Sequence, residues 1–170
     1  MKTSCGVIIL NEQNEILMGH VTGQKFNDIP KGLLEEQEVP LACALRECQE
    51  ETALILDAPR MQEIGLQPYN KEKNLHLFLY CVNKAEIKLE SLECQSFFEH
   101  FYSKKMVPEV DSFSWVALSE VETMCAKSMS KLLIKLAENG FLNYNINYQT
   151  PDFQVVDNLE QTRDNSKSRP

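Results

Sequence analysis

The segment from residue 39 to residue 53 constrains this chain most, because its pattern predicts a helix with two unlike sides. Small and apolar residues recur on one side with a period of about 3.6, at Leu41, Ala44, Leu45, Cys48 and Thr52. Glu47, Glu50 and Glu51 fall on another side, within about 100° of one another. Pro40 suits the first turn of this helix, where a missing N–H does no harm. We therefore expect a helix that packs on a sheet and presents three carboxylates to a cleft.

These three glutamates repel one another unless a positive charge lies nearby. Like charges three and four residues apart on a helix cost about 0.2–0.5 kcal/mol per pair. Arg46 offsets part of this repulsion, and a bound cation would offset more. Taken alone, the acidic side is also consistent with an ordinary solvated helix surface. Whether these glutamates bind a cation or form a solvated surface therefore depends on how they are spaced relative to other residues of the chain.

The overall charge of the chain limits its partners. The net charge is −8, from 17 basic and 25 acidic residues. This balance argues against generic binding of duplex nucleic acid, which depends on Lys and Arg neutralising phosphates. It permits a small anionic substrate if a metal ion lies between protein and phosphate. No apolar run approaches the roughly 18 residues of a membrane helix, and the first residues lack the features of a signal peptide. We expect a cytoplasmic protein without a membrane partner.

The cysteines do not suggest a zinc site or a disulfide framework. Six cysteines occur, at positions 5, 43, 48, 81, 94 and 125, and no two are spaced as C-x2-C. The three histidines, His20, His76 and His100, are interpreted as strand or loop residues. We therefore expect Cys43, Cys48 and Cys81, which lie within apolar patterns, to be small buried residues, as is usual in a cytosolic chain.

Strand and helix patterns alternate along the chain. Strands are expected at residues 3–10, 15–22, 60–69, 75–83 and 113–118, the first two as a hairpin and the fourth in a central position. Helices are expected at residues 39–53 and 128–138, the second ended by Asn139-Gly140. Residues 23–32 are expected to form a loop, and residues 86–108 a short helix or an insertion. Ser119 and Glu122 resemble a capping box that opens a further helix.

Strands interspersed with helices predict an α/β or α+β sandwich with a mixed sheet. A chain of 170 residues has the usual size of one domain, and we find no repeat and no linker in it. From about residue 150 the sequence is polar. We assign residues 1–149 to the domain and residues 150–170 to a disordered tail.

The helix belongs to a longer motif of fixed spacing. Gly32 is followed after five residues by Glu38, and after seven more by Arg46-Glu47. After two further residues come Glu50-Glu51. This arrangement resembles the box of the Nudix hydrolases, G-x5-E-x7-R-E-U-x-E-E-x-G-U, where U is a bulky aliphatic residue. All five charged positions are present, which makes the motif highly specific. The resemblance covers about residues 3–138.

The resemblance implies a fold, a reaction and a cofactor. The fold is an α/β/α sandwich with a mixed sheet. The reaction is hydrolysis of a nucleoside diphosphate linked to another group, and the cofactor is Mg²⁺ or Mn²⁺. The residues agree with this reading, because Mg²⁺ takes a near-octahedral set of oxygens from carboxylates, waters and phosphates. Such an ion can neutralise a diphosphate and lower the pKa of bound water.

The resemblance also assigns roles to residues of the box. Glu50 and Glu51 are the main metal ligands, and Glu47 is a ligand or the base that deprotonates water. Arg46 orients a glutamate by a charge-assisted hydrogen bond. Glu38 is an outer ligand or an alternative base. The backbone carbonyl of Gly32 is a further candidate ligand, since glycine permits close approach.

Two residues outside these roles are weaker candidates. The family often adds a glutamate from a loop beyond the box, and Glu109, six residues before Trp115, is our candidate ligand or base. The alternative is that Glu109 is a solvated loop carboxylate. Lys31 is a candidate contact for a substrate phosphate, although a lysine at a turn is commonly just exposed.

This sequence departs from the family pattern at three positions. Ala53 replaces the glycine of the box, Cys48 stands at an aliphatic position, and Asn27 stands where many relatives have an aromatic residue. If residue 53 has a positive φ, alanine is strained there by about 1 kcal/mol. Because of these departures a second hypothesis stays open, in which the chain is a nucleotide-binding or regulatory module that has lost catalysis.

The substrate itself stays open at this point. Nucleoside triphosphates, dinucleoside polyphosphates, nucleotide sugars and capped RNA all contain the required linkage. An RNA 5′-end pyrophosphohydrolase is a third possibility, with Lys104-Lys105 as a local basic patch. The aromatic run at residues 97–102 is interpreted as a packing cluster, with stacking on a nucleobase as the alternative. The sequence contains no signal for an oligomeric state.

Overall fold

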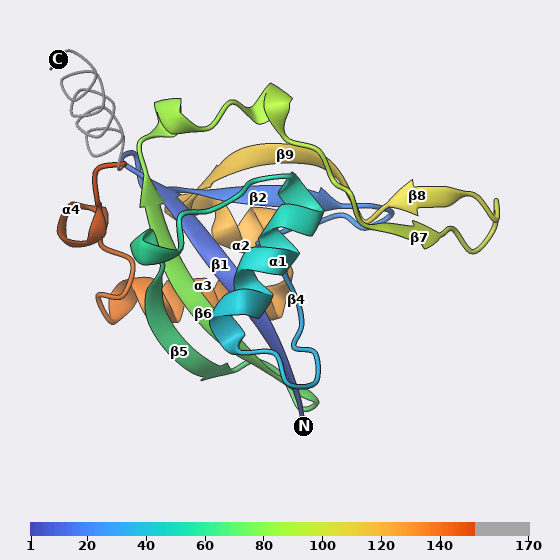
Figure 1. The fold of residues 1–170 in the computed structure, drawn as a ribbon, viewed down its shortest axis with the longest axis horizontal. Helices are drawn as coiled ribbons and strands as arrows, with labels where there is room; N and C mark the ends of the chain where they lie inside the picture. Colours follow the sequence, from blue (N-terminus) through green and yellow to red (C-terminus); the bar gives the residue numbers. More distant parts are fainter. Residues whose placement is uncertain (152–170) are drawn as a thin grey trace, which may run out of the picture.

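The computed structural model describes residues 1–151, and a mixed sheet of seven strands runs through this part of the chain (Figure 1). The strands of this sheet are β1 (Lys2–Asn11), β2 (Glu15–Val21), β3 (Asn27–Asp28), β4 (Lys31–Leu33), β5 (Gln62–Pro68), β6 (Lys73–Val82) and β9 (Val110–Ala117). A second sheet contains β7 (Phe97–Glu99) and β8 (Met106–Pro108). The α-helices are α1 (Pro40–Thr52), α2 (Val121–Met124), α3 (Lys127–Glu138) and α4 (Tyr144–Asn147). The expected tail lies outside the described residues from position 152 onward.

The long strands β1 and β6 form the centre of the large sheet. They pair in parallel along their whole lengths, from Lys2 opposite Lys73 to Asn11 opposite Val82. The strand order is β3-β2-β1-β6-β5, with β9 paired to β2 and β4 paired to β1. The expected central position of β6 is therefore confirmed, and so is the hairpin of β1 and β2.

The sheet opens between β1 and β2, and this opening positions the motif. The two strands pair only near their shared turn, at Leu10 and Ile16. Further along, β4 takes the place of β2 and pairs antiparallel with Ser4–Gly6 of β1. Residues 23–32, expected as a loop, thus contain two short strands. A three-residue strand with a glycine at its centre carries no period-2 pattern, which explains why the sequence did not reveal it.

Helices cover both faces of the sheet, so the expected α/β/α sandwich is confirmed (Figure 1). The period-2 alternation of β1 sends Ile8 and Leu10 to one face and Val7 and Ile9 to the other. The first face packs against α3, whose buried residues include Leu133 and Met129. On the second face lies α1, which contributes the buried residues Cys43, Ala44 and Cys48.

The helix boundaries agree with the sequence except at one start. Helices α1 and α3 match the expected segments within one residue at each end, and Gly140 ends α3 with a φ of 80°. The expected capping box at Ser119 is wrong. That residue lies inside a 3-10 turn at Leu118–Glu120, and α2 starts at Val121 without a side-chain cap. Ser119 is therefore placed too early in the chain to cap the helix.

The segment at residues 86–108, expected as a short helix or an insertion, contains short 3-10 turns and a hairpin. It begins with 3-10 turns at Lys84–Glu86 and Leu89–Ser91, and it continues into the hairpin of β7 and β8. We refer to residues 97–108, which include this hairpin, as the arm. The arm projects from the body of the molecule beyond β2 and β9 (Figure 1).

Within residues 1–151, none of the helices has the length and apolar character needed to cross a membrane. All six cysteines of the chain are free and buried, which confirms the burial expected of Cys43, Cys48 and Cys81.

Candidate active site

Helix α1 brings the acidic residues of the motif together because its opposite side is buried. Cys43, Ala44, Cys48 and Thr52 pack towards the sheet and fix the rotation of the helix about its axis. The helix ends at Ala53, whose φ of 68° and ψ of 4° place it in the left-handed region. The N–H of Ala53 donates to the carbonyl of Gln49, so this residue closes the helix as the family's glycine would.

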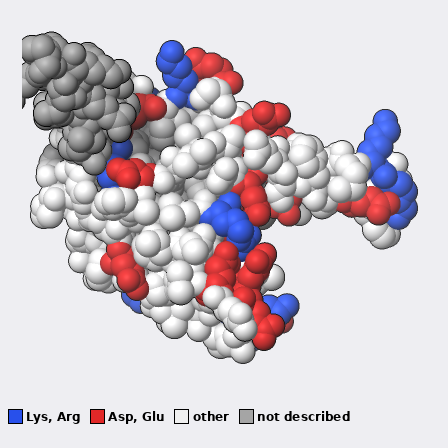
Figure 2. Space-filling model, in the orientation of Figure 1, with Lys and Arg blue, Asp and Glu red and all other residues white. Residues whose placement is uncertain are grey.

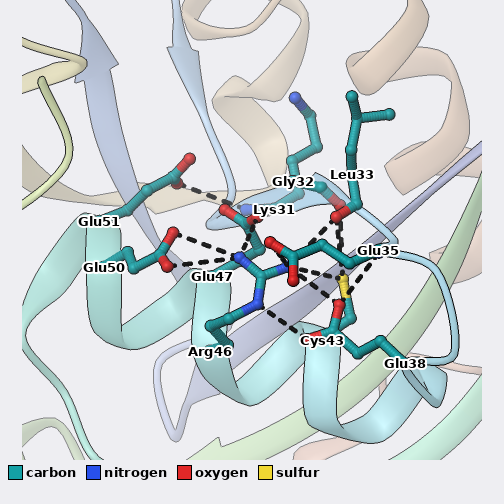
Figure 3. A network of polar contacts seen from close by, with 10 residues as sticks. All are labelled: Lys31, Gly32, Leu33, Glu35, Glu38, Cys43, Arg46, Glu47, Glu50 and Glu51. Atoms are coloured by element: carbon teal, nitrogen blue, oxygen red, sulfur yellow. Dashed lines mark hydrogen bonds and ion pairs between the residues drawn. The ribbon is translucent and has the colours of Figure 1, made fainter. Parts of the chain in front are cut away.

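Arg46 connects three of the glutamates (Figure 3). Its Nε and Nη2 donate to the two carboxylate oxygens of Glu38 at 2.8 and 2.9 Å, a bidentate pair. Its Nη1 donates to Glu47 at 2.8 Å and, at a longer 3.3 Å, to Glu50. Nη2 also donates to the carbonyl of Leu33 at 3.2 Å. One guanidinium thus offsets much of the repulsion within the acidic side of α1.

Hydrogen bonds from Arg46 hold the pKa of Glu38 at about 2, well below its usual range. The same bonds raise the pKa of the Arg46 guanidinium. Glu38 is therefore ionised at neutral pH, and it anchors the loop before α1 to the helix.

Gly32 in β4 lies directly under the carboxylate of Glu47. A Cβ at position 32 would overlap the carboxylate carbon and both oxygens of Glu47. The side chain of Glu47 is 13% exposed and hydrogen-bonded to Arg46, so it has little freedom to move aside. The glycine is required here by the close approach of a side chain, whereas its φ is unremarkable.

Glu51 is the most deeply embedded of the three helix glutamates. Its pKa is raised to about 8, chiefly by burial, and the charges of Glu47 and Asp28 contribute to the shift while Lys31 opposes it. The backbone N–H of Lys31 donates to its carboxylate at 3.4 Å. The pKa of Glu47 is also raised, chiefly by burial, and against the effect of Arg46. The site thus confines more carboxylates than its own cations neutralise.

Glu51 opens onto a pocket of 270 Å³ between α1 and the start of β9. Its polar lining is Asp28, Lys31, Glu51 and Glu109, and its apolar lining is Val21, Ile29 and Val110. Glu109, 58 positions beyond Glu51 in the sequence, therefore faces the same pocket as the helix. The Lys31 ammonium lies in this lining and pairs with Asp28 at 2.8 Å.

Asp28 is the pocket residue to which the sequence assigned no role. It comes from the two-residue strand β3, and its carboxylate fixes the direction of the Lys31 side chain. The available signal was the opposite charge three positions before Lys31. That signal is weak in a loop, because only helices make such a spacing a reliable contact.

The donor set of the site suits a hard divalent cation. Within residues 1–151, no three carboxylates are already gathered into a group that could hold a metal ion, because Arg46 draws Glu38, Glu47 and Glu50 towards itself. The oxygens present are nevertheless the type that Mg²⁺ and Mn²⁺ prefer. Burial raises the pKa of Glu51, so a cation bound at this carboxylate would favour its ionised form. The residues therefore fit such an ion.

Comparisons with known proteins agree with this geometry. Residues 2–136 match the family model described as the NUDIX domain. A phage T4 protein, described as an uncharacterized 17.7 kDa protein in the e-segB intergenic region, is 31% identical over 146 residues. That match covers 80% of this chain and 96% of the phage protein.

Solved structures show the same fold at low sequence identity. An Ap4A hydrolase from C. elegans superposes with a TM-score of 0.55 and 16% identity, covering 80% of this chain and 96% of the other. The dihydroneopterin triphosphate pyrophosphohydrolase of E. coli gives the same TM-score and identity, with coverages of 81% and 96%. Since the family model spans most of the sequence, including the whole acidic motif, the chain belongs to the Nudix hydrolase family.

Proposed function

We propose that this protein is a metal-dependent hydrolase that cleaves the pyrophosphate bond of a nucleoside diphosphate linked to another group. The candidate substrates are nucleoside triphosphates, dinucleoside polyphosphates and nucleotide sugars. The proposal is carried by one observation: Glu47 lies against Gly32, which admits its close approach, and Glu51 of the same helix lines a pocket together with Lys31 and Glu109. Solved structures of the same fold are named for Ap4A and for dihydroneopterin triphosphate, which supports an oligophosphate substrate.

The proposed cofactor is Mg²⁺ or Mn²⁺. Glu47, Glu50 and Glu51 are its proposed ligands, with Glu38 as an outer ligand and the carbonyl of Gly32 as a further oxygen. When bound, the ion supplies charge neutralisation for the diphosphate and a lowered pKa for coordinated water. The excess of buried carboxylates over cations in the site supports this choice.

The chain's own residues then bind and position the reactants. Glu47 or Glu109 accepts a proton from the attacking water. The water oxygen bonds to one phosphorus, and the bridging oxygen leaves with the other phosphoryl group. Lys31 contacts a substrate phosphate once that phosphate competes with Asp28 for the ammonium. Arg46 acts as a positioning residue, because its hydrogen bonds set the directions of Glu38, Glu47 and Glu50.

We place this activity in the cytoplasm as part of the proposal. All six cysteines are free thiols, which is usual in a reducing compartment.

The test is release of phosphate or nucleotide from a panel of these three substrate classes, with millimolar Mg²⁺ or Mn²⁺. We expect hydrolysis of at least one class, and its loss when EDTA is added. Glu51→Gln keeps the shape of the side chain and removes its charge, so turnover should fall by orders of magnitude while the far-ultraviolet circular dichroism is retained.

Glu36→Gln is the matched control, since Glu36 is an exposed residue of the loop before α1. Its turnover should equal that of the wild type. Wild-type turnover in Glu51→Gln would overturn the assignment of the site. Absence of turnover with every substrate, together with tight binding of one nucleotide, would instead establish a binding module without catalysis.

A further inference from the structure

The arm is a short hairpin, yet it exposes several large apolar side chains to solvent. Phe101 is 75% exposed, Tyr102 86% and Met106 64%. Phe97 and Phe98, in the first strand of the arm, are also exposed. A two-stranded hairpin is at best marginally stable in water by itself, and contiguous exposed apolar surface marks an interaction site. The arm therefore has the properties of an unpaired half of an interface.

The backbone of the arm also lacks partners. Among the described residues, β7 pairs with β8 and with no other strand, so the outer edges of both strands present unpaired N–H and C=O groups. Such edges readily pair with another chain. The expectation that residues 97–102 form a packing cluster is not met within this molecule, because their aromatic side chains project into solvent.

The tip of the arm is aromatic and basic. Phe101 and Tyr102 make an edge-to-face pair with ring centres 5.1 Å apart, and the Lys104 ammonium lies 5.1 Å from the Phe101 ring. Lys105 follows directly, and Glu99 is the acidic residue of the arm. Blue side chains lie at the far end of the arm with a red side chain beside them, on a molecule whose net charge is −8 (Figure 2). The tip thus suits an acidic, partly apolar acceptor.

An acceptor of this kind lies at the base of the same arm. It is a groove of 340 Å³ lined by Leu92, Glu93, Phe97, Pro108, Asp111 and Phe113, among other residues. A cavity of about 150 Å³ suffices for a benzene ring, so the groove has room for an aromatic side chain. Glu93 and Asp111 are both exposed acids of the groove, and Asp111 contacts His20 at 2.7 Å, so Glu93 is the acid that has no ion pair among the described residues.

We propose that the arm binds a second copy of this chain, with the tip of each arm in the base groove of the other. Base and tip lie at opposite ends of β7, and the stretch from Phe97 to Phe101 spans roughly 13 Å at the rise of a β-strand. A two-fold axis that passes beside the midpoint of the arm, perpendicular to it, lays the second arm antiparallel along the first, so that the tip of each arm meets the base of the other. The surface is therefore self-complementary, as a symmetric dimer requires. In this dimer, Lys104 and Lys105 of one copy face Glu93 of the other.

The decisive experiment uses two charge-reversed variants of the full chain. In Lys104→Glu/Lys105→Glu an acidic tip faces a groove that is also acidic, and in Glu93→Lys the basic tip faces a groove that carries an added lysine. Each variant alone should dimerise at least about tenfold more weakly than the wild type, because like charges now meet at both contacts. An equimolar mixture should recover the dimer, since each tip then faces a groove of opposite charge. Sedimentation velocity between micromolar and 100 micromolar protein, at about 50 mM salt, measures dimerisation of each variant and of the mixture against the wild type.

Lys71→Glu serves as the matched control, because Lys71 is an exposed lysine in the turn between β5 and β6. It should dimerise like the wild type. A second variant, Phe101→Ser/Tyr102→Ser, tests the apolar part of the contact and should be monomeric with an unchanged circular dichroism spectrum. A monomeric wild type throughout this range would overturn the proposal. A dimer that all arm variants leave intact, or a mixture that stays monomeric, would overturn it equally.

Discussion

Ala53 is a residue whose backbone conformation conflicts with its side chain. Its φ of 68° costs alanine about 1 kcal/mol relative to glycine. We therefore predict that Ala53→Gly raises the free energy of unfolding by up to about 1 kcal/mol, measured by urea denaturation. Ala42→Gly is the control, because Ala42 is exposed within α1 with helical geometry. There the same change should destabilise by about 0.5–1 kcal/mol. Destabilisation by both variants would show that position 53 does not need a positive φ in solution.

Glu51 should make the stability of the metal-free protein fall as pH rises. Its pKa in the folded state is about 8, above the usual 4.5, so the folded protein holds a proton that the unfolded chain releases between these values. Stability is therefore lost as pH rises from 4.5 to 8. With EDTA present, we predict that Glu51→Gln removes about 1–3 kcal/mol of this decline between pH 5 and pH 8. Urea denaturation at successive pH values measures it, and identical profiles for both proteins would contradict it.

The sequence could predict which residues gather at the site but not how they bind one another. Helical periodicity alone places Glu47, Glu50 and Glu51 on one side of α1. The bidentate bond of Arg46 to Glu38 depends on the course of the loop before the helix, which no periodic pattern specifies. The same reason hid the pairing of Asp28 with Lys31.

At the scale of elements, the contact between β4 and α1 depends on Gly32. We predict that Gly32→Ala lowers the free energy of unfolding by about 1–3 kcal/mol, because its Cβ overlaps the Glu47 carboxylate. Glu47→Ala removes the obstacle. The double variant should therefore be more stable than the sum of the two single effects predicts, with a coupling energy of at least about 1 kcal/mol. Additive effects in this cycle would refute the proposed overlap.

Long elements were predictable because their periodicity extends over many residues, and short ones were not. The helix at residues 39–53 and the strand at residues 75–83 each span enough residues to show their period, and both are confirmed. Strands β3 and β4 contain two and three residues. Strand β4 pairs with β1, and β3 pairs with β2, where β1 and β2 diverge, which is a property of the sheet and not of their own sequence.

At the scale of the whole molecule, the sandwich depends on both of its helical layers. Leu133 of α3 is fully buried against the sheet. We predict that Leu133→Ala lowers the free energy of unfolding by about 2–5 kcal/mol, through lost apolar burial and an added cavity. Leu66→Ala, on β5, is the control because Leu66 is 54% exposed, and it should change stability by less than about 0.5 kcal/mol. Guanidinium denaturation measures both, and similar losses would argue against α3 as a layer of the core.

The parallel pairing of β1 with β6 also has a consequence for how the chain is made. Lys2 pairs with Lys73, so the central strand must wait for a partner about 70 residues downstream. At about 5–20 residues per second, a ribosome needs roughly 4–14 s to synthesise that interval. During this time the apolar segment of β1 has its hairpin partner β2 but lacks its longest neighbour. The nascent chain therefore exposes the apolar residues of β1 for seconds. Until β6 has been synthesised, dilution or chaperones that bind such segments limit aggregation.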